Sequence, residues 1–291
     1  MIYGVTDIGT NTIRAVIYEE NVEIKAIDEL VFESEILINT KNNILTDDGI
    51  KKLVLVLKKS IEFFLKNNVE KIYFFATSAM RDVKNFLQIN DEVYKTLSIK
   101  IDLLEEKDEI LCDFYGIKLI LGENSSGEAI DLGGGSCQII SFENGELKSG
   151  KSLKIGVKRL YQRFSKSPSA LVEYVSEELK KAPIKESENL YVMGGTSKNI
   201  LATLKILHPE IKNSFEVEKL EEIKNVDFSK GRFFEIYKNR VNTIAYGVCV
   251  IGEIAKKCKA KRITVINSDA RKGYIAFKKG KWLWMVLKKL K

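Results

Sequence analysis

The stretch TDIGTNT at residues 6–12 recurs as IDLGGGS at residues 130–136. Asp, Gly and a hydroxyl-bearing residue keep the same spacing in both copies. Each copy follows an apolar segment and leads into another, TIRAVIYE at residues 12–19 and SCQIISFE at residues 136–143. Two glycine turns between strands, roughly half a chain apart, predict two related domains that face each other across a cleft.

The residues after the first copy alternate between strand and helix patterns. Residues 22–30 read as a third strand, and Thr46 is a good N-cap for a helix whose apolar residues recur at helical spacing as far as Leu65. The aromatic run KIYFFA at residues 71–76 is typical of a buried strand between covering helices. This order predicts an α/β fold, in which ligands bind at the carboxyl ends of strands.

Composition narrows the classes of partner. The chain has 291 residues, enough for about two domains. Its net charge of +7 favours anionic partners, although a solvated lysine-rich surface explains the same charge. No zinc-finger or RNA-binding signature is present, so small polyanions are favoured over nucleic acid. The single histidine, His208, precedes a proline near the end of a predicted helix, which leaves acid–base chemistry to carboxylates.

The cysteine pattern and the apolar runs indicate the compartment. The four cysteines form no CxxC pair and predict free thiols in a reducing compartment rather than a disulfide framework. No apolar run reaches the roughly 20 residues that a membrane span needs, and the first residues lack the pattern of a signal peptide. We therefore expect a cytoplasmic protein without a membrane span.

The two glycine turns suit phosphate binding. Glycine lets the backbone approach a ligand closely, and successive N–H groups then form an anion-binding concavity. Neutral side-chain donors stand beside them at Thr10, Asn11, Thr12 and Ser136. Asp7 and Asp131 would repel phosphate, so their expected partner is a divalent cation. The alternative is that each aspartate caps its own turn.

Two further segments have anion-binding patterns. Thr77 and Ser78 follow the strand at residues 71–76, and Arg81 comes three residues later. Arginine can bind phosphate through two hydrogen bonds; the alternative is a capped helix with Arg81 on its surface. Gly194-Gly195-Thr196 ends one predicted strand and opens a helix, and helix N-termini attract anions.

These segments together resemble the exopolyphosphatase/guanosine pentaphosphate phosphohydrolase (Ppx/GppA) family of the actin-like ATPase superfamily. The matching stretches, in the family's order, are DIGTNTIRAVIY, ATSAMRD, EEKDEILCDFYG, IDLGGGSCQI, SLKIGVKRLYQRF, GGTSKNI and SDARKGYI. They cover nearly the whole chain, whose length resembles the short form with only two ribonuclease-H-like domains. We expect these domains at residues 1–118 and 119–277. We expect a tail at residues 278–291, with Trp282, Leu283, Trp284, Met285 and Leu287, to pack on the first domain.

The resemblance implies hydrolysis of a terminal phosphoanhydride in polyphosphate or guanosine penta- or tetraphosphate, with Mg²⁺ or Mn²⁺ as cofactor. It places the general base at Glu109, counted back from Tyr115-Gly116, with Arg81 as a catalytic phosphate ligand. The expected phosphate-binding residues are Gly9, Thr10, Asn11, Thr12, Arg14, Thr77, Ser78, Gly133, Gly134, Gly135, Ser136, Gly194, Gly195 and Thr196. The expected metal ligands are Asp7, Asp131 and, with reduced affinity, Gln138. Glu105, Glu106 and Asp108 lie close enough in sequence for a register error, and the alternative for residues 105–109 is the acidic first turn of a surface helix.

Departures from the family pattern keep two other functions open. Cys137-Gln138 stands where the family typically has Thr-Glu, and glutamine brings no negative charge to a metal. Glu105-Glu106 replaces a Ser-Gly pair, which adds negative charge near a polyanion. Both changes favour a regulator that binds polyphosphate or guanosine phosphates with weak or no hydrolysis. Gly194–Thr196, where related kinases and ATPases bind adenosine, favours an ATP-dependent enzyme instead. Family members commonly form dimers, but the sequence has no interface signature, and it does not select one substrate.

Overall fold

The computed structural model describes residues 1–34, 36, 38–228, 230, 233, 237 and 241–289, with side chains as far as residue 280. Contacts divide the chain into two compact units, one of Met1–Glu109 with Tyr274–Lys291 and one of Ile110–Gly273. The predicted boundaries after residues 118 and 277 stay predictions, as does the cleft. The predicted apolar side chains of the tail lie outside the described residues: Trp282, Leu283, Trp284, Met285 and Leu287.

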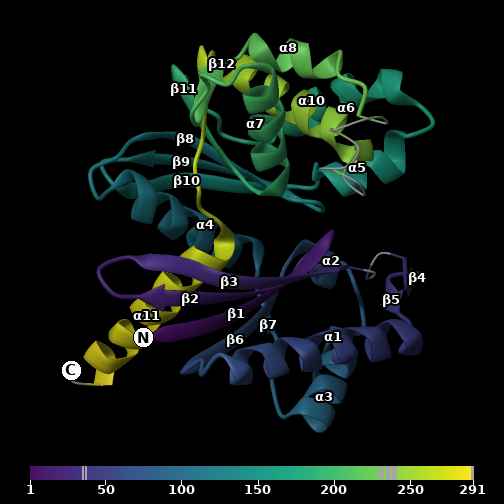
Figure 1. Ribbon diagram of the computed structural model, residues 1–291, viewed down its shortest axis with the longest axis vertical. Helices are drawn as coiled ribbons and strands as arrows, with labels where there is room; N and C mark the ends of the chain where they lie inside the picture. The colour runs from purple at the N-terminus through teal and green to yellow at the C-terminus, as the bar shows by residue number, and fades with distance from the viewer. Residues whose placement is uncertain are drawn as a thin grey trace. The chain divides into compact units, whose positions relative to one another are not determined.

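The first unit has a five-stranded sheet in the order β3-β2-β1-β6-β7 (Figure 1). Three antiparallel strands are followed across the sheet by two parallel ones: β3 (Ile24–Glu33), β2 (Thr12–Glu20), β1 (Ile2–Ile8), β6 (Lys71–Ala76) and β7 (Asp102–Leu103). A two-stranded hairpin, β4 (Thr40–Lys41) and β5 (Ile44–Leu45), lies outside this sheet. The four strands predicted from sequence in this part of the chain are confirmed to within a few residues.

Helices cover both faces of this sheet. Successive strand residues point to opposite faces, so neighbouring residues of β6 contact different helices. Phe74 packs on Phe64 of α1 (Asp47–Lys66), while the next residue, Phe75, stacks on Tyr274 of α11 (Ala270–Lys289) with ring centroids 4.7 Å apart. The predicted N-cap of α1 is confirmed, since the Thr46 hydroxyl accepts from the Gly49 N–H at 3.2 Å. Two further helices belong to this unit: α2 (Ser78–Arg81) and α3 (Phe86–Leu97).

The second unit repeats the same topology with one added strand, in the order β10-β9-β8-β11-β13-β12 (Figure 1). Antiparallel β10 (Glu146–Leu153), β9 (Cys137–Glu143) and β8 (Gly127–Leu132) are followed by parallel β11 (Asn189–Met193) and β13 (Arg262–Val265), and then by antiparallel β12 (Ser214–Glu216). The same strand order and directions in both units confirm the prediction of two related α/β domains.

Two layers of helices also cover the second sheet. One face packs on α4 (Glu106–Leu121) through residues such as Phe114 and Ile117. The other face forms the larger core, with α5 (Val157–Phe164), α6 (Leu171–Leu179), α7 (Gly195–Leu207), α8 (Lys219–Lys224) and α10 (Val241–Lys257). A short 3₁₀ turn, Pro168–Ala170, precedes α6.

Cys112, Cys137, Cys249 and Cys258 are all free thiols, as predicted. Among the helices of the described residues, none is both long enough and apolar enough to cross a bilayer.

Candidate functional site

The first glycine stretch forms the tight turn between β1 and β2. The two strands pair with Asp7 opposite Arg14, and the turn closes where the Gly9 N–H donates to the Thr12 carbonyl at 3.1 Å. Asp7 is half-buried at the end of β1. The predicted strand–turn–strand loop is therefore present in the first unit.

The second stretch forms the same turn between β8 and β9. Asp131 lies opposite Gln138, and the Gly133 N–H donates to the Ser136 carbonyl at 3.0 Å. The positions that match in sequence thus also match in strand pairing and in backbone hydrogen bonding. This match makes a coincidental resemblance between the two turns a poor explanation.

Both loops present backbone donors. Within the described part of the chain, the N–H groups of Thr10 and Asn11 in the first loop, and of Gly134, Gly135 and Ser136 in the second, make no hydrogen bond. Unpaired N–H groups on successive residues are the feature by which a backbone turn binds an anion. Each unit therefore carries one loop with the chemistry expected for phosphate.

The parallel strands of the first unit bring two more predicted segments beside the first loop. Ile8 at the end of β1 pairs with Ala76 at the end of β6, and Ala76 pairs with Leu103 at the end of β7. Thr77 and Ser78 follow β6 directly and are buried. The carboxyl edge of this sheet thus gathers the first loop, the two hydroxyl residues and the segment that leads into α4.

Arg81 and Glu109 form an ion pair within this edge. Arg81 Nη1 lies 2.7 Å from Glu109 Oε2, and it donates to the Leu104 carbonyl at 2.7 Å. Their side chains are only 14% and 9% exposed, so the alternative of a surface Arg81 is wrong. Arg81 therefore places a positive charge directly beside the Glu109 carboxylate.

Glu109 is more deeply buried than the acidic residues that precede it in sequence. Glu105 and Glu106 are exposed and Asp108 is half-buried, whereas Glu109 is 6% exposed. The surface-helix alternative therefore describes Glu105 and Glu106 but not Glu109. Asp113, one helical turn further along α4, is completely buried and was not anticipated from sequence.

Arg14 forms an ion pair with a residue of the neighbouring strand. Its Nη1 lies 2.9 Å from Glu29 Oε2 on β3, and both side chains are partly solvent-exposed. Ion pairs of this kind contribute little to stability, about 0–1 kcal/mol. Arg14 can therefore exchange Glu29 for a phosphate at small cost.

The second loop rests on the N-terminus of α5. The first-turn amides Val157 N–H and Lys158 N–H donate to the Gly133 and Gly134 carbonyls at 3.0 and 2.9 Å. Arg159 Nε donates to the third carbonyl of the loop, Gly135, at 2.9 Å. Because its carbonyls are turned toward α5, the loop has N–H groups that no described residue engages, and these are available to a ligand.

Gly156 makes this support possible. A Cβ at this position would lie 2.4 Å from Gly135 C and 2.4 Å from Ser136 N, so only glycine lets α5 approach the loop. Gly156 and Arg159 lie in the stretch SLKIGVKRLYQRF, which carries part of the family resemblance, and the sequence alone assigned neither residue a role. The available signal was a glycine between apolar residues directly before a helix.

Gln138 acts as a hydrogen-bond donor in the second unit. Its Nε2 donates to the hydroxyls of Ser136 and Ser152 at 3.0 Å each, and the side chain is buried. The metal role of Gln138 stays a prediction. The neighbouring Cys137 faces the core, where burial, with the charges of Asp131 and Asp113, raises the pKa of its thiol well above the ordinary value.

The Gly194 turn lies against the second loop. Gly194 has φ +96°, and a Cβ there would lie 2.6 Å from Asp131 Oδ1, so both backbone conformation and contact require glycine. α7 begins at the next residue, Gly195, and Thr196 lies in its first turn. The predicted turn is thus placed beside Asp131, whose charge is favourable near a helix N-terminus.

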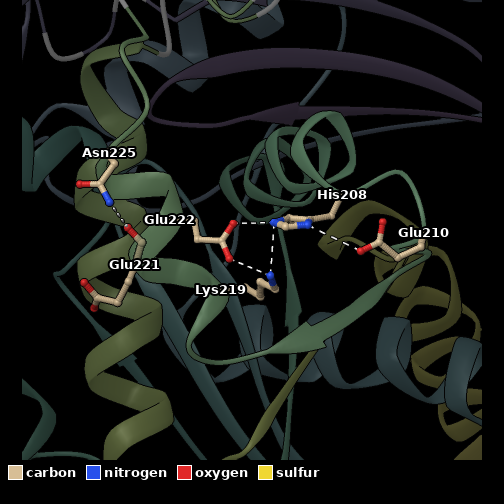
Figure 2. Close-up of polar contacts among 6 residues, drawn as sticks. All are labelled: His208, Glu210, Lys219, Glu221, Glu222 and Asn225. Atoms are coloured by element: carbon tan, nitrogen blue, oxygen red, sulfur yellow. Dashed lines mark hydrogen bonds and ion pairs between the residues drawn. The ribbon is translucent and has the colours of Figure 1, made fainter.

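His208 is confirmed as a helix-end residue, since it is the C-cap of α7. Figure 2 shows its ring between two carboxylates: Nε2 contacts Glu222 and Lys219, and Nδ1 lies 3.6 Å from Glu210. The turn at Gly194 is at the other end of this helix, roughly 20 Å away at 1.5 Å per residue. His208 is therefore outside the candidate site.

Comparison of the sequence with known proteins identifies one family. Residues 34–279 match the model of the Ppx/GppA phosphatase family. The bifunctional 3-dehydroquinate synthase/phosphatase of Fusobacterium nucleatum is 30% identical over 196 residues, which cover 63% of this chain and 29% of that protein. Exopolyphosphatase 1 of Mycobacterium tuberculosis is 25% identical over 167 residues, which cover 54% of this chain and 47% of that protein. The chain thus spans less than half the length of these relatives.

Comparison with solved structures gives the same fold. The exopolyphosphatase from Cytophaga hutchinsonii has a TM-score of 0.81 at 20% identity, over 95% of this chain and 97% of that chain. The Aquifex aeolicus Ppx/GppA family member has a TM-score of 0.79 at 19% identity, over 97% of this chain and 98% of that chain. Both structures correspond to the present chain over nearly its whole length.

Proposed function

The chain belongs to the Ppx/GppA phosphatase family, and from this we propose that it releases the terminal phosphate of inorganic polyphosphate or guanosine pentaphosphate by hydrolysis. Glu109 is the general base in this proposal. The two glycine loops bind phosphate oxygens, and Arg14 and Arg81 neutralise negative charge on the transferred group.

The observation that carries the proposal is the buried pair of Glu109 and Arg81. A carboxylate at 6% exposure is costly unless it is paired, and Arg81 supplies the partner at 2.7 Å. The pair lies at the carboxyl edge of the same sheet whose β1–β2 turn has N–H groups without a partner among the residues that the structure describes. A base, a cation and an anion-binding loop thus belong to one edge of one unit, as phosphoryl transfer to water requires.

In the proposed reaction, the oxygen of a water molecule forms a bond to the terminal phosphorus. The bond from that phosphorus to the bridging oxygen breaks, and the bridging oxygen keeps the electron pair. Glu109 accepts a proton from the water, so the products are orthophosphate and a chain shorter by one phosphate. Arg81 holds the Glu109 carboxylate through its ion pair and so orients the base.

Two of the three side chains predicted to bind Mg²⁺ or Mn²⁺ have the chemistry that such a cation prefers. Asp7 and Asp131 offer carboxylate oxygens, the ligands that these cations prefer. Gln138 presents its amide nitrogen to two serine hydroxyls and offers no charge. Among the described residues, no group of three or more His, Cys, Asp or Glu could hold a metal by itself. We propose that Asp7 and Asp131, each at the end of the strand before its own loop, are the residues that would hold a cation, which would supply positive charge to phosphate oxygens.

The test compares Glu109→Gln with Glu106→Gln. The Glu106 side chain is exposed on the same helical turn and serves as the matched control. Phosphate release is measured on polyphosphate, guanosine pentaphosphate and ATP, with and without Mg²⁺. Loss of a general base should lower the rate about 100- to 10,000-fold, while the control, which removes only an exposed negative charge, should keep at least the wild-type rate. Equal rates in wild type and Glu109→Gln would contradict the assignment, and turnover of ATP alone would favour the kinase or ATPase alternative.

A second candidate function, a phosphate-binding regulator with weak hydrolysis, is favoured by Gln138. This residue replaces the acid that the family resemblance leads us to expect, and its amide is already committed to Ser136 and Ser152. Calorimetry that shows tight binding of the same ligands, with no phosphate release by the wild type, would support this candidate.

A further inference from the structure

Gln138 determines the direction of the hydrogen bonds beneath the second loop. It lies on β9 opposite Asp131 of β8 and opposite Ser152 of β10, and only 2% of it is exposed. Its amide Nε2 donates one hydrogen to Ser136 Oγ and the other to Ser152 Oγ, both at 3.0 Å. An amide nitrogen has two hydrogens, so both are used.

This arrangement leaves the proton of the Ser136 hydroxyl available. A serine hydroxyl that accepts a hydrogen bond keeps its own O–H to donate elsewhere. Ser136 belongs to the loop in which, among the described residues, the N–H groups of Gly134, Gly135 and Ser136 itself have no partner. The loop therefore offers one hydroxyl donor together with three amide donors.

A carboxylate at the same position would reverse the bond. Glutamate has only acceptor oxygens when ionised, so it would take the Ser136 proton and leave the hydroxyl as an acceptor. An acceptor hydroxyl beside a carboxylate suits a cation, whereas a donor hydroxyl beside free N–H groups suits an anion. The amide and the acid thus give the same loop opposite ligand preferences.

We propose that Gln138 makes Ser136 a hydrogen-bond donor to a phosphate oxygen, so that the Ser136 hydroxyl binds the polyphosphate anion directly and not through a cation held by residue 138. The inference rests on the proposed function, because it assumes that the loop receives a phosphate chain. It assigns Gln138 as a positioning residue that acts through Ser136.

The test is a double-mutant cycle on ligand affinity. Isothermal titration calorimetry measures tripolyphosphate binding to wild type, Ser136→Ala, Gln138→Glu and the double variant, in EDTA and again in Mg²⁺. Loss of a hydrogen bond to a charged group should make Ser136→Ala weaken binding in EDTA by about 10-fold or more. The same serine change made on top of Gln138→Glu should have little further effect, because the hydroxyl no longer donates to the ligand.

Gln138→Met provides a variant of similar size without a buried charge, in case the glutamate variant folds poorly. It removes both donors and leaves the Ser136 hydroxyl free to rotate, so its loss of affinity in EDTA should be smaller than that of Gln138→Glu. Far-ultraviolet circular dichroism checks the fold of each variant.

The outcomes separate this inference from the proposed function. An equal loss from Ser136→Ala in both backgrounds, or no loss in the wild-type background, would overturn the role of Gln138. Wild-type binding that appears only with Mg²⁺ would also overturn it, while the proposed hydrolase would stand. No binding by the wild type under either condition would refute the proposed function itself.

Discussion

Replacing Gly156 by alanine should displace the second loop while leaving most of the fold intact. Gly156 has φ −64° and ψ 147°, a conformation open to any residue, so the added methyl group brings no backbone strain. The expected loss of stability comes only from steric overlap of the new methyl group with the loop. The new Cβ would lie 2.4 Å from Gly135 C and Ser136 N, and 2.5 Å from Gly134 C.

The size of the effect follows from these distances. Carbon atoms pack about 3.5 Å apart or further, so α5 and the loop must separate by about 1 Å. The bond between Val157 N–H and the Gly133 carbonyl, now 3.0 Å, would then be too long to persist. Overpacking of this kind costs about 1–3 kcal/mol of stability. A displacement of about 1 Å at a binding site can cost about 100-fold in activity.

The assay combines thermal unfolding with tripolyphosphate affinity and the rate of phosphate release. Gly252→Ala in α10 is the matched control, since its Cβ would meet only Leu220 Cδ1 at 3.9 Å, an ordinary contact. The control should keep wild-type affinity and gain about 0.5–1 kcal/mol from its helical position. If Gly156→Ala retained the affinity, rate and unfolding temperature of the wild type, the argument that α5 supports the loop would be refuted.

Three further outcomes are expected. Arg159→Met removes the donor to the Gly135 carbonyl and should weaken tripolyphosphate binding by about 10-fold. Guanidinium added to the solution should restore part of the lost affinity. Unchanged affinity of the variant would exclude a role of Arg159 in holding the loop. Burial by itself would raise the pKa of Asp269. Neighbouring groups, of which the Arg271 charge has the largest effect, lower this pKa to about 2. This carboxylate therefore stabilises the fold above pH 4, and about 2 kcal/mol is lost as pH falls from 4 through 2; unfolding temperatures of Asp269→Asn should lack that slope. Gly273→Ala should yield no folded protein, because its Cβ would lie 1.6 Å from the Cys112 carbonyl oxygen, and a normal circular dichroism spectrum would contradict this.

Local features of the fold were predictable because they depend on neighbouring residues. The turns at Gly9 and Gly133, the N-cap at Thr46 and the aromatic strand at residues 71–76 are confirmed. Each is decided by backbone conformation or by periodicity within a few residues. The repeat predicted two related domains, and the strand orders β3-β2-β1-β6-β7 and β10-β9-β8-β11-β13 agree with that prediction.

The composition of the candidate site was less predictable, because burial depends on what packs against each residue. Four acidic residues stand between positions 105 and 109, and the spacing alone could not show that Glu109 is the buried one with Arg81 as its partner. The sequence likewise did not indicate that Arg14 pairs with Glu29 on the neighbouring strand.

By itself the sequence indicated the family, the α/β class and the positions of the two glycine loops, because glycine turns and strand periodicity are local properties. The folded structure was required to show that α5 holds the second loop through Gly156 and that Gln138 donates to Ser136. Those contacts join residues of separate elements, and their distances are set by the packing of helix on turn and of strand on strand.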